Sequence, residues 1–432
     1  MRKKEKPWLL VGLGVSNLGA AKLINKRQEH FEYTSDEKIP KETSRQLEKL
    51  GGKLKQNKDF EPTKYKGIIT SPGIPPSHPI ISKAKGRTFV GTEIDYALRN
   101  TAKDLKAIYV TGTNGKSTVT AMITHLLNQN GHSATSCGNF GLPVSEALLN
   151  NPKSLLVIEI SSYQIEYLST PISGVAVITT LSPDHLTRHG NYEGYVRTKL
   201  KICSNQNHLT VVTTTKVKKT AETICKKSFF LEDDSETVSH SSWRVCLIDC
   251  KENDPLESNK SLSKAALKEY LGENLSSFNL SFESFVPLPY RFQEFRSRKG
   301  RLIINDSKST NLESTEAAII KMKEPFILAL GGQSKGESFD KLVKHNKKLI
   351  AVCLFGESAD KIAEDLKDLP AQKVRKFITL QDLLSSFEEM CLPKNAPFLF
   401  SPGCASFDEF KNFIVRGEFV FRHFAQQPQD QA

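Results

Sequence analysis

The feature that most restricts the fold of this chain is a glycine-rich turn between an apolar run and a helical pattern. The motif of this turn extends from Val110 to Thr118 and begins at the end of the apolar run Ala107–Thr111. Gly131 marks the expected end of the helix. This order of elements predicts a strand, a loop and a helix of an α/β protein. The apolar residues that recur at helical spacing after the turn are Val119, Met122, Ile123, Leu126 and Leu127.

The same turn has the chemistry of a phosphate-binding loop. In such a loop the backbone N–H groups and the helix N-terminus point at phosphate, while a lysine reaches its outer oxygens and a hydroxyl binds Mg²⁺. Lys116 and Ser117 occupy the positions of that lysine and that hydroxyl. Thr113 and Asn114 alone separate the two glycines, whereas the Walker sequence has four residues there. A structural turn would fit these letters too, but the flanking strand and helix favour a nucleotide site.

The length of the chain predicts several domains. At about 150 residues per domain, 432 residues suggest three. Apolar runs alternate with helical stretches, as in doubly wound α/β folds. We therefore expect Rossmann-like domains at residues 1–96 and 287–432, and a central domain with a mostly parallel sheet at residues 97–286. The polar stretch 216–264 receives no assignment. Strands are predicted at Leu9–Val11, Gly67–Thr70, Leu155–Ile160, Val175–Thr179, Leu302–Ile304, Phe326–Leu330, Ile350–Phe355 and Phe398–Phe400.

The composition of the chain excludes some classes of protein. No apolar stretch approaches the roughly 20 residues that span a bilayer, so we expect no membrane insertion. Eight cysteines without metal-ligand or disulfide spacing suit a reducing cytoplasm. The basic start of the chain imitates a secretory signal, but Gly12 and Gly14 interrupt its apolar run, so export is not expected. The net charge of +12 is compatible with nucleic acid, a membrane surface or an anionic substrate, and the basic residues are scattered along the chain.

Polar residues follow the later strands of the central domain at their carboxyl ends, where open α/β sheets bind ligands. Glu159 lies near the end of one strand, and Asp184 and His185 follow the next. A carboxylate at this edge can hold Mg²⁺, and a histidine can join it. A solvated glutamate and an ordinary loop histidine are the simpler alternatives. Lys199, on a probable helix with Tyr195, would be a surface lysine by default.

The first domain contains a turn that suits a diphosphate. Gly12 and Gly14 open a helix as they would in a dinucleotide-binding motif, but Asn17 replaces the third glycine. Asp36 is placed where an acid could meet a ribose or a base. The turn is compatible with any diphosphate at a helix N-terminus.

The third domain has lysines in two loops that follow strands, Asn305–Asn311 and Gly331–Gly336. A capping box at Ser406–Glu409 predicts a helix that starts there. A helix start beside two lysines would suit a carboxylate ligand. A capped core helix with surface lysines explains the pattern equally well. The side chains that this helix would bury are Phe407, Phe410 and Ile414.

Together these motifs resemble the Mur ligases of peptidoglycan synthesis. The segment Glu159–Glu166 is similar to the branch of the family that adds D-glutamate. The resemblance implies a first domain for the UDP part of the substrate, a central ATPase, and a last domain for the incoming amino acid. The other matching segments, in the order of the family, are Thr111–Thr118, Gly138–Gly141, Asp184–His185, Lys199, Arg291, Asn305–Asn311, Gly331–Gly336 and Ser401–Phe413.

The resemblance also implies the reaction. ATP would phosphorylate the carboxylate of UDP-N-acetylmuramoyl-L-alanine, and the amine of D-glutamate would attack the acyl phosphate to leave an amide, ADP and phosphate. The implied cofactors are ATP and two Mg²⁺ ions, with Lys199 carbamylated so that it helps to position the second ion. The chain would act in the cytoplasm, as a monomer, on these small molecules and not on nucleic acid.

Residue by residue, the resemblance implies a catalytic group and three binding sites. The catalytic residues would be Lys116, Glu159, His185 and Lys199, the last three of which would bind metal together with Ser117. ATP would be bound by Gly112, Thr113, Asn114, Gly115, Lys116, Ser117, Thr118, Asn259, Arg291 and Asp306. The UDP substrate would be bound by Val15, Ser16, Asp36, Gly73, Asn139 and Gln164. D-Glutamate would be bound by Lys308, Thr310, Lys335, Ser406 and Phe413.

The chain departs from the family pattern in four places. The His-Asn-x-x-Asn motif appears as Ser258–Leu262, which leaves one adenine contact open. Thr180 replaces an asparagine, Thr187 an aspartate and Tyr290 a histidine. None of these changes removes a phosphate, metal or lysine position, so they do not imply an inactive protein.

Three other functions stay open on the sequence. A sister Mur ligase or a folylpolyglutamate-like ligase would add another amino acid with most of the same motifs. A phosphate-loop protein that binds nucleic acid would account for the net charge of +12. A sugar-nucleotide binding protein with a decayed ATPase would account for the departures from the family.

Overall fold

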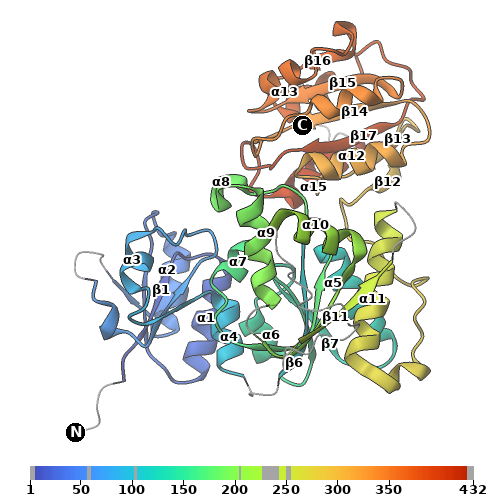
Figure 1. Cartoon of the computed structure of the whole chain (residues 1–432). Helices are drawn as coiled ribbons and strands as arrows, with labels where there is room; N and C mark the ends of the chain where they lie inside the picture. Colours follow the sequence, from blue (N-terminus) through green and yellow to red (C-terminus); the bar gives the residue numbers. More distant parts are fainter. Residues whose placement is uncertain are drawn as a thin grey trace. The chain divides into compact units, whose positions relative to one another are not determined.

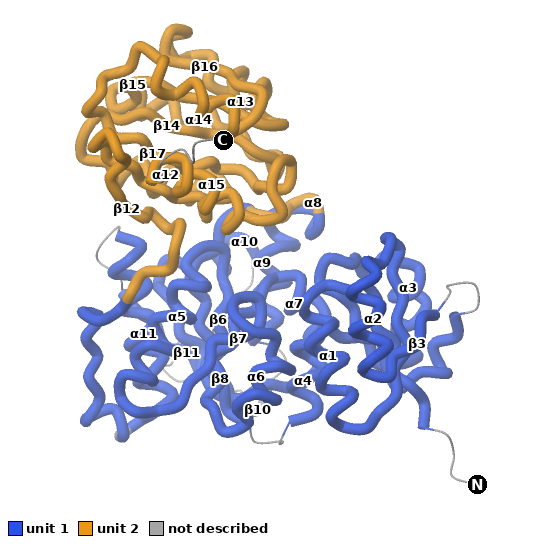
Figure 2. The backbone as a smooth tube through the Cα atoms, turned by 180° about the vertical axis from the view of Figure 1, so that it is seen from behind, with its two compact units in different colours: residues 1–183, 188–285 blue, residues 184–187, 286–432 orange. Residues whose placement is uncertain are grey.

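The structure is a computed structural model that describes residues 5–55, 60–101, 105–203, 206–225, 243–249 and 254–425. These residues form three β-sheets with helices around them (Figure 1). They divide into two compact units, the first made of residues 1–183 and 188–285 and the second of residues 184–187 and 286–432 (Figure 2). Within the described ranges, every helix is too short or too polar to cross a membrane.

The first sheet has five parallel strands in the order β3-β2-β1-β4-β5. Asn17, where a dinucleotide-binding motif has its third glycine, is buried and joins β1 to β4, because its Nδ2 donates to Val11 O and Ile69 O at 3.1 and 3.2 Å. The strands are β1 (Trp8–Val11), β2 (Phe31–Thr34), β3 (Lys53–Leu54), β4 (Gly67–Thr70) and β5 (Phe89–Gly91). The helices are α1 (Val15–Lys26), α2 (Lys41–Lys49), α3 (Pro79–Ala84) and α4 (Glu93–Arg99).

The second sheet has six parallel strands in the order β11-β10-β9-β6-β8-β7. The strands are β6 (Lys106–Thr111), β7 (Ala134–Gly138), β8 (Leu155–Glu159), β9 (Ile172–Ile178), β10 (Gln206–Thr214) and β11 (Trp243–Ile248). The helices are α5 (Lys116–Gln129), α6 (Val144–Asn150), α7 (Ser162–Glu166), α8 (Leu186–His189), α9 (Tyr192–Leu200), α10 (Thr215–Cys225) and α11 (Pro255–Leu271). The phosphate loop follows β6, and other candidate residues lie at the ends of the strands beside it. This sheet therefore positions the candidate ATP site.

Strand β6 shows why the apolar runs of this sheet are continuous. Ile108 and Val110 belong to one buried cluster, together with the apolar face of α5, whereas Ala107 and Tyr109 belong to another. Side chains of a strand alternate between its two faces, so both faces of the sheet are covered. The second of these clusters also includes core residues of the first sheet, such as Leu10, which places both sheets in one unit.

The third sheet has six strands in the order β12-β13-β17-β14-β15-β16, and its first pair is antiparallel while the others are parallel. The strands are β12 (Gln293–Arg296), β13 (Leu302–Asn305), β14 (Phe326–Gly331), β15 (Leu349–Phe355), β16 (Val374–Lys376) and β17 (Phe398–Gly403). The helices are α12 (Leu312–Lys321), α13 (Ala359–Asp365), α14 (Leu380–Ser386) and α15 (Phe413–Ala425). The α/β fold with mostly parallel sheets is thus confirmed.

The predicted strands are confirmed, with ends that differ by a few residues. Each predicted domain contains one sheet, but α4 crosses the expected boundary at residue 96, and the division into three domains stays a prediction. The unassigned stretch 216–264 contributes to α10, β11 and α11. Residues 226–242 and 250–253 of that stretch lie outside the described ranges.

The helix predicted from the capping box at Ser406 is wrong. A turn lies there, in which Phe410 N donates to Ser406 O at 2.7 Å. Helix α15 begins at Phe413, and Asn412 Oδ1 caps it by accepting hydrogen bonds from Ile414 N and Val415 N. Glu409 instead accepts a hydrogen bond from the first residue of α14, Leu380 N, at 3.0 Å. Phe407 and Ile414 are 69% and 51% exposed, not buried, because the chain turns away before α15. Phe410 alone packs on the core as expected.

Candidate active site

The loop between β6 and α5 depends on two glycines in the left-handed region of backbone space. Gly112 has a φ of 138° and Gly115 a φ of 85°. A Cβ on Gly112 would lie 2.0 Å from Thr179 Oγ1, and a Cβ on Gly115 would lie 2.6 Å from Asn259 Oδ1. Both the backbone conformation and the close neighbours therefore require glycine here.

The end of β9 holds the loop in place. Thr113 N donates to Thr180 O at 2.8 Å, and Asn114 N donates to Thr180 Oγ1 at the same distance. Thr179 Oγ1 donates to Asn114 O at 2.5 Å. Thr180, one of the departures from the family pattern, therefore has a structural role, because its hydroxyl oxygen accepts the hydrogen bond from Asn114 N. These bonds fix the loop before any ligand binds.

Two lysines converge on the same loop carbonyl. Lys116 Nζ donates to Gly112 O at 3.0 Å and to Thr113 O at 2.7 Å. Lys199 Nζ, from α9, donates to Gly112 O at 2.7 Å and lies 4.8 Å from the centre of the Tyr195 ring. Lys199 is 1% exposed, so the default expectation of a surface lysine is wrong. The two amines form a cationic end of the phosphate loop.

Glu159, at the end of β8, is also buried and not solvated. Its Oε1 accepts a hydrogen bond from Asn139 Nδ2 at 2.6 Å, and its backbone carbonyl accepts one from Asn139 N at 2.8 Å. Its Oε2 is buried without a hydrogen-bond partner. A buried carboxylate oxygen needs a donor or a cation, so this atom fits a Mg²⁺ ligand. The described part of the chain contains no cluster of three His, Cys, Asp or Glu side chains able to hold a metal, so a Mg²⁺ here would need substrate oxygens and water as well.

The other predicted residues of the ATP site lie on α5 and α11. Ser117, in the first turn of α5, is buried, and Thr118 follows it. Asn259 lies on α11 with its amide against Gly115. Leu262, where the family has a second asparagine, is fully buried in the cluster that includes α5. It fills the core there and offers no polar contact to a base.

Gln164 is part of a helix cap. Its side-chain oxygen accepts hydrogen bonds from Ser161 N and Ser161 Oγ at 2.9 and 3.0 Å, and its own backbone N–H donates back to Ser161 Oγ at 3.3 Å. This capping box starts α7 directly after β8 and fixes the position of Gln164. A predicted substrate contact thus also has a structural role.

The candidate residues for the UDP substrate in the first sheet lie on neighbouring loops. Val15 and Ser16 begin α1, and Val15 is 71% exposed. Gly73 lies in the loop after β4, which contacts the glycine turn, since a Cβ on Gly12 would lie 2.9 Å from Ser71 Oγ. Asp36 Oδ2 lies 2.8 Å from His78 Nε2. His78 Nδ1 accepts a hydrogen bond from Ile80 N, so the Nε2–H group donates a hydrogen bond to Asp36 Oδ2.

In the second unit, four of the candidate D-glutamate residues lie in loops that follow three adjacent strands, β13, β17 and β14, and the fifth, Phe413, opens α15. Their loops are bonded together: Gly403 N donates to Ser309 O at 3.0 Å, and Ala405 N donates to Gln333 O at 2.9 Å. Ser406 is buried and follows Ala405. The loops Asn305–Asn311 and Gly331–Gly336, both singled out in the sequence, are therefore both bonded to the segment Gly403–Ala405.

Arg416 of α15 was not found from the sequence, although it organises these loops. It is fully buried, and its guanidinium donates to Ser307 O, Cys404 O and Ala405 O at 3.0, 3.0 and 3.3 Å. Burial lowers the pKa of Arg416 to about 10, so it stays charged at neutral pH. An arginine within the apolar stretch Phe413–Phe424 was the signal that could have marked it.

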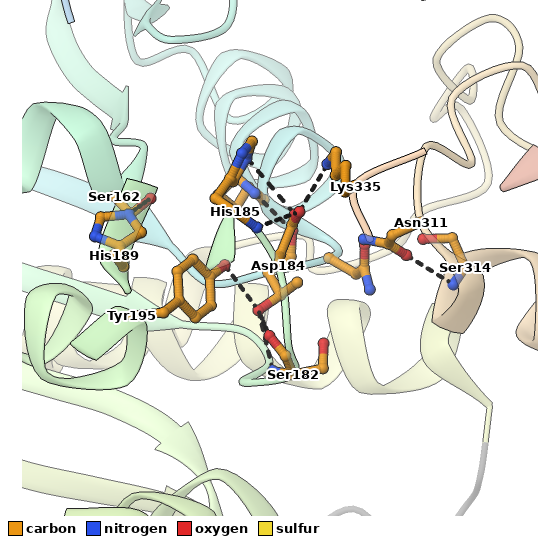
Figure 3. Close-up of polar contacts among 12 residues, drawn as sticks. Ser162, Ser182, Asp184, His185, His189, Tyr195, Asn311, Ser314 and Lys335 are labelled. Carbon is orange, nitrogen blue, oxygen red and sulfur yellow. Dashed lines mark hydrogen bonds and ion pairs between the residues drawn. The ribbon is translucent and has the colours of Figure 1, made fainter. Parts of the chain in front are cut away.

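Two of the predicted lysines have defined partners. Lys308 Nζ lies 4.6 Å from the centre of the Phe413 ring, so these two candidate residues adjoin, and Thr310 follows in the same loop. Lys335 Nζ donates to Asp184 Oδ1 at 2.7 Å (Figure 3). His185 N donates to the same carboxylate at 2.9 Å. Lys335 therefore already binds a carboxylate, which is the group that glutamate would present.

His185 has a φ of 53° and belongs to the second unit, whereas Glu159 and Lys199 belong to the first. The shared metal site predicted for them therefore stays a prediction.

Arg291 and Asp306 are linked through the backbone. Tyr290 and Phe292, on either side of Arg291, have φ values of 57° and 54°, which bulky residues rarely adopt. Asp306 Oδ1 accepts a hydrogen bond from Phe292 N at 2.9 Å and so holds this backbone. Burial raises the pKa of Asp306 to about 6, although the hydroxyls of Ser309 and Ser401 favour its ionised form.

Tyr290, which stands where the family has a histidine, contacts α15. Its hydroxyl donates to Glu418 Oε2 at 2.5 Å, and its ring packs on Gly417, where a Cβ would lie 2.4 Å from the ring. Burial, with the Glu418 carboxylate, raises the pKa of Tyr290 to about 12.

Comparisons with known proteins agree with the resemblance seen in the motifs. Residues 110–242 match the Mur ligase middle domain. The UDP-N-acetylmuramoylalanine–D-glutamate ligase of Hydrogenobaculum sp. is 33% identical over 83% of this chain and 88% of its own length. The protein of the same name from Trichormus variabilis is 30% identical over 96% of this chain and 97% of its own length.

A solved structure extends the comparison to the fold. The MurF ligase of Thermotoga maritima, in complex with ADP, is 15% identical, with a TM-score of 0.56 over 98% of this chain and 98% of its own. At this identity the likeness concerns the fold alone.

Proposed function

The chain belongs to the family of UDP-N-acetylmuramoylalanine–D-glutamate ligases, a branch of the Mur ligases, and on this premise we propose how its residues serve the reaction. The activity is the ATP-dependent addition of D-glutamate to UDP-N-acetylmuramoyl-L-alanine in peptidoglycan precursor synthesis. The amide forms through an acyl phosphate, with release of ADP and phosphate.

The phosphate loop binds ATP. The N–H groups of Gly115–Thr118, at the start of α5, bind its phosphates, with Lys116 at the outer oxygens. Lys116 leaves Gly112 O when a phosphate arrives, because a phosphate oxygen is a stronger acceptor for an ammonium than a carbonyl is. Asn259 of α11 borders the loop at Gly115 and would contact the nucleotide there.

Glu159 would hold Mg²⁺ through its Oε2, which has no hydrogen-bond partner among the described residues, and Ser117 would be a further ligand. Mg²⁺ offsets the repulsion between ATP and the substrate carboxylate when both are bound. The buried Glu159 oxygen is the single observation that carries this assignment, because no protein group satisfies it among the described residues.

Lys199 is carbamylated in the active protein. Its buried amine lies beside the phosphate loop, where a carbamate would replace a cation with an anion able to help hold the second Mg²⁺. A ¹³C resonance of a carbamate, present with ¹³CO₂ in the wild type and absent from Lys199→Ala, supports the modification without an activity assay. Its absence from both proteins would contradict it.

The remaining candidates bind the two other substrates. Asn139 and Gln164 contact the muramoyl part, and the turn at Val15 and Ser16 binds the diphosphate with the Gly73 loop beside it. In the second unit Lys308 and Lys335 bind the two carboxylates of D-glutamate, and Ser406, Thr310 and Phe413 shape the pocket around it. The protein acts as a monomer in the cytoplasm, with the three domains at residues 1–96, 97–286 and 287–432.

The test is the release of phosphate from ATP in the presence of UDP-N-acetylmuramoyl-L-alanine and one amino acid at a time. We expect release with D-glutamate and none with L-glutamate, glycine, D-alanine or buffer alone. Release with another amino acid, and not with D-glutamate, would move the chain to a sister ligase. Binding of UDP substrate without any release would favour the decayed ATPase.

A further inference from the structure

Arg188 binds the loop that follows the first sheet. Its side chain is 10% exposed. Nη1 donates to Gly73 O at 3.0 Å, and Nη2 donates to Ile74 O at 2.8 Å and to Pro72 O at 3.4 Å. One guanidinium therefore holds three successive carbonyls of the loop that carries Gly73.

The same guanidinium is fixed on its other side by α7. Nε and Nη2 donate to Glu166 Oε2 at 3.0 and 2.8 Å, and the guanidinium carbon lies 4.8 Å from the centre of the Tyr163 ring. Both partners belong to the short helix that also carries Gln164. Arg188 thus connects the candidate contacts for the muramoyl part to the loop of the first sheet.

This loop in turn supports the glycine turn before α1. A Cβ on Gly12 would lie 2.8 Å from Ile74 Cδ1 and 2.9 Å from Ser71 Oγ, so the two loops are in direct contact. Ser71 N donates to Val11 O at 2.8 Å. Ile74 O also accepts a hydrogen bond from the Tyr167 hydroxyl at 2.7 Å. The loop is therefore held between the glycine turn and the segment Tyr163–Tyr167.

We propose that Arg188 is a positioning residue for the UDP substrate, which sets the distance between the glycine turn that binds the diphosphate and the helix that binds the muramoyl part. This inference rests on the proposed function, because it takes Gly73 and Gln164 as substrate contacts. An arginine suits the task better than a lysine, since the five N–H donors of a guanidinium can serve a carboxylate and three carbonyls together, whereas an ammonium has three donors.

The experiment measures the KM of each substrate for Arg188→Met and Arg188→Lys. We expect the KM for UDP-N-acetylmuramoyl-L-alanine to rise by about 10- to 100-fold in Arg188→Met, because charged hydrogen bonds to the loop are lost. The Lys variant should show a smaller rise. The kcat and the KM values for ATP and D-glutamate should stay near those of the wild type.

Lys22→Met is the matched control. Lys22 of α1 forms an ion pair with Glu146 of α6 at 2.8 Å, so it also joins a helix of the first sheet to a helix of the second, but it does not touch the loop. Its substitution should leave all three KM values unchanged. An unchanged KM for the UDP substrate in Arg188→Met, or an equal rise of all three values, would overturn the proposal. If Arg188→Met does not fold, the Lys variant decides by the same criteria.

Calorimetric binding of UDP separates this inference from the ligase activity. Weaker binding in both Arg188 variants supports the positioning role even if the wild type forms no amide. Equal binding by wild type and variants overturns the positioning role even if the ligase is active. A wild type that does not bind UDP overturns the substrate site and the role of Arg188 together.

Discussion

The two units hold their anion-binding loops by different physical means. In the first unit, Gly112 and Gly115 adopt backbone conformations that side chains disfavour, and this lets Thr179 and Asn259 approach the loop. In the second unit, the buried guanidinium of Arg416 binds the carbonyls of three residues from two loops.

The difference separates two kinds of preorganisation. The first loop is shaped by the absence of side chains at its two glycines, so backbone N–H groups can reach an anion together with the Lys116 amine. The second site is shaped by one side chain, so its loops depend on a buried charge that donates to backbone carbonyls. We therefore expect steric changes to harm the first unit most and charge or shape changes to harm the second.

The largest effect is expected from Glu159→Gln. The amide keeps the size of the side chain but loses the charge that Mg²⁺ needs, so kcat should fall on the order of 1000-fold. A Mg²⁺ titration of phosphate release measures this. Glu146→Gln, at a partly exposed carboxylate that pairs with Lys22, should keep wild-type turnover. Wild-type kcat and Mg²⁺ dependence in Glu159→Gln would remove Glu159 from the metal site.

Gly112→Ala tests the steric half of the comparison. The new Cβ would lie 2.0 Å from Thr179 Oγ1 and 2.9 Å from Thr180 N, so the loop must shift and kcat/KM for ATP should fall about 100-fold. Gly131→Ala is the control, because Gly131 has a φ of 80° but no neighbour within 4 Å of the added Cβ. It should cost about 1 kcal/mol of stability and leave turnover intact. Equal losses of turnover in both variants would refute the argument from close contacts.

The first unit also buries an ionisable group, the carboxyl of Glu93. Burial raises the pKa of Glu93 from 4.5 to about 7, although Ser145 N donates to it at 2.5 Å. The folded state therefore binds the proton more tightly than the unfolded state. Its contribution is fully present below pH 4.5 and is lost as the pH rises through 7, a loss on the order of 3 kcal/mol.

Glu93→Gln should remove this part of the pH dependence. Urea unfolding at pH 5 and at pH 8 measures it, and the variant should lose less stability between the two than the wild type does. The same difference in both proteins would show that Glu93 is ionised in the fold at low pH.

Arg416→Lys tests whether the loops of the second unit depend on the guanidinium. It should have the smallest effect of the four substitutions. Lysine keeps the charge but cannot reach all of the carbonyls, so the KM for D-glutamate should rise about 10-fold while the KM for ATP is unchanged. Arg422→Lys, at an exposed ion pair with Glu418 on the same helix, should change neither. A rise in the KM for ATP, with the KM for D-glutamate unchanged, would contradict a role of Arg416 in the loops that bind D-glutamate.

The sequence predicts well where one local rule decides the structure. The phosphate loop was found because glycines, a lysine and a hydroxyl follow an apolar strand within a few residues. The core strands β6, β8 and β9 were found because both of their faces are covered. By contrast, β10 is rich in threonine and polar at its start, and it was missed because its pattern resembles a loop.

Features that depend on contacts between distant segments were not predicted. The letters Ser406–Glu409 satisfy a capping rule, but the Glu409 carboxylate caps α14, and the helix begins at Phe413 instead. From the sequence, Lys199 is expected to be a surface lysine, but it is buried because α9 packs against the phosphate loop. Arg188 shows no local signal, because its partners lie in the loop Pro72–Ile74 and at Glu166.

The acyl phosphate is tested most directly by following one oxygen atom of the substrate carboxylate. UDP-N-acetylmuramoyl-L-alanine is labelled with ¹⁸O in its alanine carboxylate and incubated with ATP, D-glutamate and the protein. Because ATP phosphorylates that carboxylate before the amine attacks, the released phosphate should carry one ¹⁸O for each amide formed. Amide product accompanied by unlabelled phosphate would contradict the acyl phosphate and the central claim with it.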